Sequence, residues 1–117
     1  MRDARLYQRL PFDGEGRLTL QEGQAEVTTI NISKGGACLR VDKSCWFQIE
    51  ALDQISGVLG IDGSDFNFNG RICWSSTNGE RVHFGVEFLD CDRDLINQVL
   101  ERMSIVENTD GGDPFII

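Results

Sequence analysis

Residues 66–88 read FNFNGRICWSSTNGERVHFGVEF, and this stretch decides the fold. Apolar residues alternate with polar ones on both sides of Asn78-Gly79, first from Phe66 to Trp74 and then from Val82 to Phe88. A period of two is typical of strands with one face in a core, and Asn-Gly is a strong signal for a tight turn. The stretch therefore predicts a hairpin of two long antiparallel strands.

A second hairpin is predicted upstream, around the hexapeptide Asn31-Ile32-Ser33-Lys34-Gly35-Gly36. Apolar alternating runs at 27–32 and 37–41 flank it. Asn and Ser suit turns because their short side chains bond the nearby backbone, and glycine permits a positive φ. We expect one face to hold Thr28, Ile30 and Ile32, and one side of the next strand to hold Ala37, Leu39 and Val41.

The remaining strands are less regular. Arg17–Leu20 alternates as a half-buried strand should, and Ile55–Ile61 reads as a strand interrupted by Gly57 and Gly60, with a bulge, before a turn at Asp62-Gly63. Residues 43–53 fit neither a period of two nor one of 3.6, so their structure stays open. Many short strands separated by turn signals predict a small antiparallel barrel.

The two ends of the chain differ from this middle. Residues 1–12 contain arginines and Pro11, which forbids a continuing helix, so they predict an extended, mobile arm. Residues 92–103 change to a helical period with an apolar stripe and with Asp90 or Asp92 as N-cap; the stripe is formed by Leu95, Ile96, Val99, Leu100 and Met103. We therefore divide the chain into an arm (1–12), a barrel plus helix (13–103) and an acidic, loosely ordered tail (104–117), whose apolar end at residues 115–117 is a candidate for docking.

The length, the apolar content and the net charge of the chain limit the functions that it can have. The 117 residues fit one domain, and no apolar run reaches the ~20 residues that a membrane helix needs. With no apolar leader in residues 1–12, we expect a cytoplasmic protein. The net charge of −8 argues against binding a nucleic-acid polymer. Residues 1–10 nevertheless carry +2, and because salt confines each charge effect to about 8–10 Å, such a segment can hold a small dianion.

The sequence gives little support for a catalytic or a metal-binding site. The four cysteines show no zinc-like spacing, and the only histidine is His83, so we expect reduced thiols, no metal and no cofactor. His83 and Glu87 share the polar face of their strand, but no nucleophile or metal set stands beside them. We expect no enzymatic activity.

Two segments together resemble the two-part signature of the PilZ domain family, an RxxxR segment followed by (D/N)xSxxG. Arg5 and Arg9 match the first part, and Asn31, Ser33 and Gly36 match the second. The later segments GRICW (70–74) and FGVEFL (84–89), followed by a helix, also look like the closing strands of that family. The resemblance implies an all-β fold with a C-terminal helix, built on a six-stranded antiparallel barrel, and cyclic di-GMP as the ligand.

The resemblance also implies the ligand contacts. Arg5 and Arg9 would bind phosphate and guanine, since a guanidinium fork matches both. Asn31 would meet a guanine edge and Ser33 a base or phosphate, while Gly36, with Gly35, would serve by conformation and close approach. Trp74 is a secondary candidate, because its place in the alternation favours a core role. Asn31 stands where most of the family has Asp, and Ala4 favours one ligand per chain, with Arg2 keeping a ligand pair open.

The sequence thus predicts a cyclic di-GMP receptor or adaptor that regulates a downstream protein, in motility, biofilm formation or a similar process. In this hypothesis the arm folds over the barrel beside residues 31–36 when ligand binds and changes the surface shown to the partner. The alternative is a PilZ-like adaptor that binds proteins but no nucleotide. The partner and the oligomeric state are not predicted.

Overall fold

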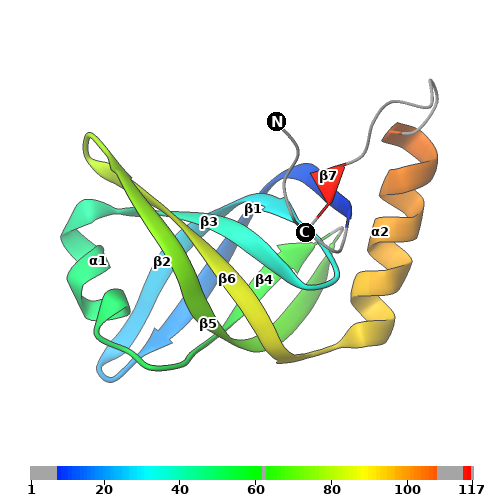
Figure 1. Ribbon diagram of the computed structural model, residues 1–117. Helices are drawn as coiled ribbons and strands as arrows, with labels where there is room; N and C mark the ends of the chain where they lie inside the picture. The colour runs from blue at the N-terminus through cyan, green and yellow to red at the C-terminus, as the bar shows by residue number, and fades with distance from the viewer. Residues whose placement is uncertain (1–7, 62, 108–114, 117) are drawn as a thin grey trace.

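The computed structural model describes residues 8–61, 63–107 and 115–116, and the side chains of 14–61 and 63–102. Strands dominate the chain, and the two helices lie at opposite ends of the barrel that the strands form (Figure 1). The elements are β1 (Gln8–Leu20), β2 (Gly23–Ile32), β3 (Gly36–Asp42), α1 (Lys43–Glu50), β4 (Ile55–Ile61), β5 (Ser64–Asn78), β6 (Arg81–Cys91), α2 (Arg93–Glu107) and β7 (Phe115–Ile116).

The strands close into a barrel. Their order is β2-β3-β6-β5-β4-β1, and β1 also pairs with β2, so six antiparallel strands leave no open end to the sheet. The predicted six-stranded antiparallel barrel with a C-terminal helix is confirmed. The short strand β7 adds to it by pairing Phe115 with Arg9 and Ile116 with Gln8, so these two tail residues lie against β1.

One continuous apolar core fills the barrel. Fully buried side chains come from every strand whose side chains are described and from both helices, among them Leu18, Leu39, Ile49, Leu59, Phe66, Phe84 and Ile96. The three rings of Phe66, Phe68 and Phe88 contact one another, with centroids 5.2–6.4 Å apart. The alternation in residues 66–88 therefore places its apolar side chains in or against the core as predicted, with the exception of Trp74.

Residues 43–53, whose structure was left open, begin with α1. Ile49 on its inner side is fully buried, and Trp46 packs on Phe84 with ring centroids 5.0 Å apart. Phe47 points away from this contact and is 63% exposed. One buried isoleucine and one half-buried tryptophan are enough to fix a short helix over a barrel end, but they are too few to give a clear helical period.

Two strand predictions are corrected. β4 is not interrupted: all seven of its residues pair with β5, and a side chain at Gly57 would collide with the carbonyl oxygen of Arg17 on β1. In β2 the core face holds Ala25, Val27 and Thr29, not Thr28 and Ile30, because one extra residue at Ile30 shifts the register against β3. Beyond that bulge Ile32 returns to the core.

The boundaries of the end segments also differ from those predicted. β1 begins at Gln8, so residues 8–12, which the sequence assigned to the arm, are strand; residues 1–7 lie outside the described part. Helix α2 runs to Glu107, and its N-cap is Asp92, whose Oδ1 accepts a hydrogen bond from the Leu95 amide at 3.1 Å. The predicted stripe is confirmed for Ile96, Val99 and Leu100, which are buried, and for Leu95, which packs against the core; the Met103 side chain lies outside the described part. No helix of the described chain is long and apolar enough to span a membrane.

Candidate functional site

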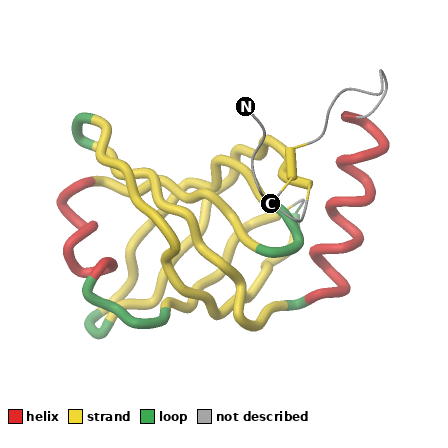
Figure 2. The backbone as a smooth tube through the Cα atoms, viewed as in Figure 1, coloured by secondary structure: helices red, strands yellow, loops and turns green. Residues whose placement is uncertain are grey.

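The motif turn joins β2 to β3 at the end of the barrel that carries α2, as Figure 2 shows. Ser33 organises it. Its hydroxyl is fully buried, accepts hydrogen bonds from the amides of Gly35 and Gly36, and donates to the Gly36 carbonyl, each at 3.2 Å. The Ser33 amide also donates to the Gly36 carbonyl at 2.8 Å. With these bonds made, Ser33 shapes the turn and presents no free hydroxyl to solvent.

Neither glycine of the turn has a positive φ, and Gly36 is required by close packing. The described glycines with positive φ are Gly23, Gly63 and Gly79, so the expectation of a positive φ in the motif is wrong. A side chain at Gly36 would instead collide with the carbonyl oxygen of Val86 on β6. The Gly35 carbonyl accepts from the Phe88 amide at 2.8 Å. A residue without a side chain is therefore required at position 36, because β6 lies directly against it.

Asn31 faces outward because of the bulge at Ile30. It pairs with Cys38 on β3 and with Pro11 on β1, whereas Thr29 pairs with the core residue Leu39. The Asn31 side chain is half-buried, and its Oδ1 atom is buried without a hydrogen-bond partner. Thr29 Oγ1 is also buried and unpaired, but it belongs to the core face. On the outer face Asn31 thus offers a desolvated acceptor with nothing bound to it.

Trp74 also faces outward, and the expected core role is wrong. Ile72 pairs with the core residue Val86, but Trp74 pairs with Gly85, so Cys73 is an extra residue on β5. Because of it, Trp74 lies on the opposite side of the sheet from Ile72. Trp74 is 40% exposed, and its indole lies where a side chain of Gly85 would be. A strict alternation in the sequence cannot reveal this bulge, because the bulge changes pairing and leaves the residue pattern untouched.

These outward residues form one row across four strands. Asn31 pairs with Cys38, Cys38 with Gly85 and Gly85 with Trp74, so the amide and the indole lie on the same face. Three strand spacings of about 4.8 Å separate their backbones by roughly 14 Å. Because Gly85 has no side chain, the Trp74 indole can lie over it, so the row has a polar end at Asn31 and an aromatic end at Trp74.

The predicted arginines lie at the edge of what is described. Arg5 falls outside the described residues. Arg9 lies on β1, opposite Phe115, two residues before Pro11, which pairs with Asn31. The structure therefore brings the backbone of Arg9 close to Asn31, and describes neither arginine side chain.

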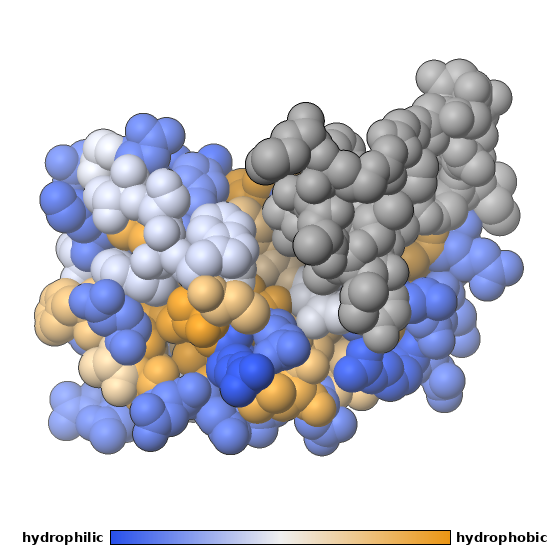
Figure 3. Space-filling model, viewed as in Figure 1, coloured by the Kyte–Doolittle hydropathy of each residue, from blue (hydrophilic) through white to orange (hydrophobic). Residues whose placement is uncertain are grey.

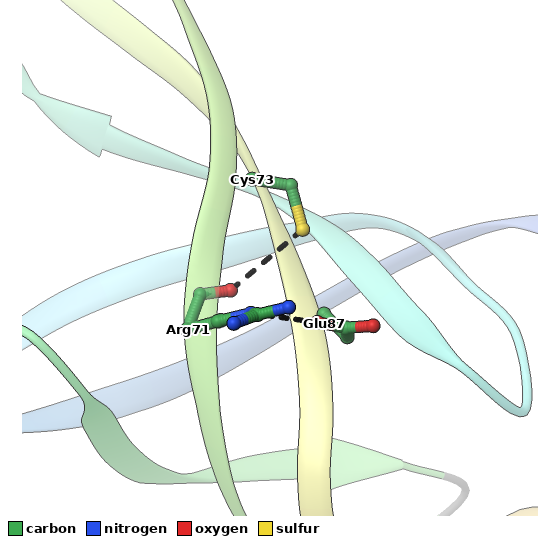
Figure 4. A network of polar contacts seen from close by, with 3 residues as sticks. All are labelled: Arg71, Cys73 and Glu87. Atoms are coloured by element: carbon green, nitrogen blue, oxygen red, sulfur yellow. Dashed lines mark hydrogen bonds and ion pairs between the residues drawn. The ribbon is translucent and has the colours of Figure 1, made fainter.

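An ion pair between β5 and β6 lies next to this row of residues. Arg71 on β5 reaches across to Glu87 on β6, with Nε and Oε1 2.8 Å apart, and Cys73 lies on the same side (Figure 4). Burial raises the pKa of the Cys73 thiol above its ordinary value, and the negative charge of Glu87 raises this pKa further. Cys73 is therefore a weak nucleophile at neutral pH.

A polar groove of about 240 Å³ lies further along β1, β2 and β3. Three carboxylates line it, from Glu15, Glu26 and Asp42, together with Arg40 and Arg81. Arg81 and Asp42 form an ion pair with 3.4 Å between nitrogen and oxygen. The lining of this groove therefore carries one more negative than positive side chain.

One contact of the motif turn has no signal in the sequence. Arg93, the first residue of α2, donates from Nη1 to the Lys34 carbonyl at 2.7 Å. The two residues are 59 positions apart, and neither is marked by a pattern. Only the placement of α2 beside the turn brings them together.

Hydrophobic residues also reach the surface. On the face drawn in Figure 3 they lie over the middle of the barrel and at its α1 end, between hydrophilic edges. The large exposed ones are Phe47, Trp74 and Leu89. No group of three or more His, Cys, Asp or Glu in the described chain is arranged to hold a metal ion, and none of the four cysteines forms a disulfide.

The architecture defines the class first: this is a small closed antiparallel β-barrel with a C-terminal helix. A family model described as "PilZ domain" matches residues 3–105, which is most of the chain. The chain belongs to the PilZ domain family. Comparison with curated proteins by sequence gave no match.

Solved PilZ structures share the fold at low sequence identity. The Bacillus subtilis inhibitor of motility MotI gives a TM-score of 0.75 at 13% identity, covering 92% of this chain and 54% of MotI. The PilZ domain of Escherichia coli YcgR, solved with c-di-GMP, gives 0.68 at 11%, covering 92% and 99%. Borreliella burgdorferi PlzA, also in complex with c-di-GMP, gives 0.57 at 10%, covering 82% and 46%. The chain thus spans about half of MotI and of PlzA, and at these identities the likeness concerns the fold.

Proposed function

We propose that this chain is a receptor for cyclic di-GMP that regulates a downstream protein. The observation that carries the proposal is the buried, unpaired Oδ1 of Asn31 on the outer face of the barrel. Leaving a buried acceptor unsatisfied costs about 1–3 kcal/mol, and a ligand donor recovers that free energy. The N1–H and N2–H groups of guanine are donors of the right kind, and Asn31 stands in the family motif.

Trp74 serves as a stacking platform for a base. Its indole lies over Gly85 in the same transverse row as Asn31, and stacking of a base on an aromatic side chain contributes about 1–3 kcal/mol. An amide acceptor and an aromatic surface on one face suit a ligand with two guanines. The Trp74 contact thus becomes a main part of the site and not a secondary one.

Arg5 and Arg9 bind the phosphates and the guanine edge. Support comes from the excess charge of residues 1–10 and from the position of Arg9 two residues before Pro11, the partner of Asn31. Charge-assisted bonds to phosphate contribute about 1.5–3 kcal/mol each. In this proposal Ser33, Gly35 and Gly36 hold the turn in shape, so that their effect on the ligand is indirect.

Binding orders the segment that carries Arg5 against residues 31–36 and changes the surface presented to a protein partner. We place this action in the cytoplasm, where four cysteines without a disulfide are ordinary. Amide exchange of residues 2–10 tests the ordering: new protection is expected with cyclic di-GMP, and unchanged exchange at saturation rejects it.

Titration calorimetry with cyclic di-GMP tests the binding itself. Wild-type protein is expected to give a saturable heat, and Asn31→Ala, Arg5→Ala and Arg9→Ala should each weaken binding by about ten- to a hundredfold. Asn67→Ala is the matched control, because Asn67 is an exposed strand asparagine outside the motif. No heat from the wild type at micromolar concentrations would reject the receptor and favour the protein-binding adaptor, for which the exposed Phe47 on α1 is a candidate contact.

A further inference from the structure

The motif turn is held from outside by two elements. Arg93 on α2 donates to the Lys34 carbonyl at 2.7 Å, and the Phe88 amide on β6 donates to the Gly35 carbonyl at 2.8 Å. Two consecutive carbonyls of the turn are therefore fixed by the strand and the helix that end the barrel. The Phe88 bond belongs to the backbone, so Arg93 supplies the side-chain contact.

The position from which Arg93 reaches the turn is itself fixed. Asp92 caps α2 through the Leu95 amide, and Ile96 and Val99 in the next turns are buried in the core. The start of α2 is thus a rigid support for the middle of the motif.

We infer that Arg93 is a positioning residue for the ligand site and that it couples ligand binding at the turn to the docking of the first turn of α2. The inference rests on the proposed function for its ligand part. A ligand that holds residues 31–36 in place strengthens the Arg93 contact, and by linkage the contact strengthens ligand binding by the same factor. The start of α2 then responds to the ligand although Arg93 does not touch it.

Amide exchange without ligand tests the structural part. In Arg93→Gln the amides of Gly35 and Gly36 should exchange about three- to tenfold faster, as expected for loss of one hydrogen bond that supports the turn. Arg93→Lys should restore part of the protection, since an ammonium can donate to the same carbonyl. Lys43→Gln removes the same charge at the other end of the barrel and should change nothing. Equal exchange in Arg93→Gln and wild type overturns the inference.

Titration with cyclic di-GMP and exchange at α2 test the coupling. If the wild type gives no binding, the proposed function fails, and the ligand-free exchange still decides the role of Arg93. If the wild type binds, Arg93→Gln should weaken affinity about three- to tenfold, and Lys43→Gln should not.

Salt separates positioning from long-range attraction. The ratio of the ligand affinities of wild type and Arg93→Gln should be the same at low and high salt, since a simple charge effect would decrease as screening increases. Ligand should also slow exchange at the Leu95 and Ile96 amides of the wild type. The coupling is overturned if the difference in affinity between wild type and Arg93→Gln disappears at high salt. It is also overturned if the ligand leaves amide exchange at Leu95 and Ile96 unchanged.

Discussion

Substitution of Gly85 by alanine should lift Trp74 off the barrel. A methyl group at position 85 would lie 2.6 Å from Cε2 and 2.7 Å from Cδ1 of the Trp74 indole, well inside contact distance. The Gly85 backbone is fixed between β3 and β5 through Cys38 and Trp74, so the ring must move instead. The perturbation therefore acts on the proposed stacking surface without altering a motif residue.

The size of the effect follows from the area that the ring covers. Trp74 is 40% exposed, so 60% of a side chain of about 250 Å² is covered, or roughly 150 Å². At about 25 cal/mol per Å², complete release would cost about 4 kcal/mol. A tilted ring keeps part of its contacts, and alanine in place of glycine gains about 0.4–1 kcal/mol in the unfolded chain. We expect a net loss of about 1–2 kcal/mol in the free energy of unfolding.

Fluorescence in a Trp46→Phe background isolates Trp74, since these are the two tryptophans of the chain. Gly85→Ala should shift the emission to longer wavelength, increase quenching by acrylamide and lower the urea midpoint. Gly60→Ala is the control, because a methyl group there meets only the Glu15 carbonyl oxygen, at 3.2 Å. If Gly85→Ala leaves emission, quenching and midpoint unchanged, the indole does not rest on Gly85.

Other predictions concern the turn, the helix cap and a thiol. Ser33→Ala removes the acceptor of two turn amides and should lower the free energy of unfolding, measured with urea, by about 1–3 kcal/mol. The control Ser44→Ala, at an exposed position on α1, should lower it little, and equal losses would contradict the role of Ser33 in the turn. Asp92→Ala should cost about 1 kcal/mol and speed amide exchange at Leu95; unchanged exchange would show that the cap is not formed in solution. Because the pKa of Cys73 is raised, its alkylation by iodoacetamide, followed by peptide mapping, should be slower than that of free cysteine at pH 8 and should increase as the pH rises past 9.0; a rate equal to that of free cysteine would contradict the shift.

The fold was predictable because most of the barrel obeys local rules. The alternation on both sides of Asn78-Gly79 gives the β5–β6 hairpin, and Leu95, Ile96, Val99 and Leu100 give the inner face of α2. The motif turn between β2 and β3 was predictable for the same reason, since its residues bond to their own neighbours. In each case the interacting residues are close to one another in the sequence, so the sequence pattern is enough to predict the local structure.

What could not be predicted depends on contacts between distant segments. Gly36 is required by the Val86 carbonyl of another strand and not by its own φ. The bond from Arg93 to Lys34 exists because α2 folds back beside the turn. No local pattern encodes either contact, and one charged residue among many on a helix surface gives no sign of its partner.

The two bulges explain why the face of the candidate site was assigned less well than the core. Without the extra residue at Ile30, Asn31 would share the side of Val27 and Thr29 and point inward; without the one at Cys73, Trp74 would follow Phe68 and Ile72 into the core. A buried carboxamide with no partner would destabilise the barrel, and a tryptophan facing inward would have to fit beside side chains that already fill the core. The bulges move both residues to the outer face and into the same row. Two of the register shifts in the described strands, those at Ile30 and Cys73, thus coincide with residues of the proposed site, while the shifts between Pro11 and Gly14 and between Asn69 and Gly70 lie elsewhere.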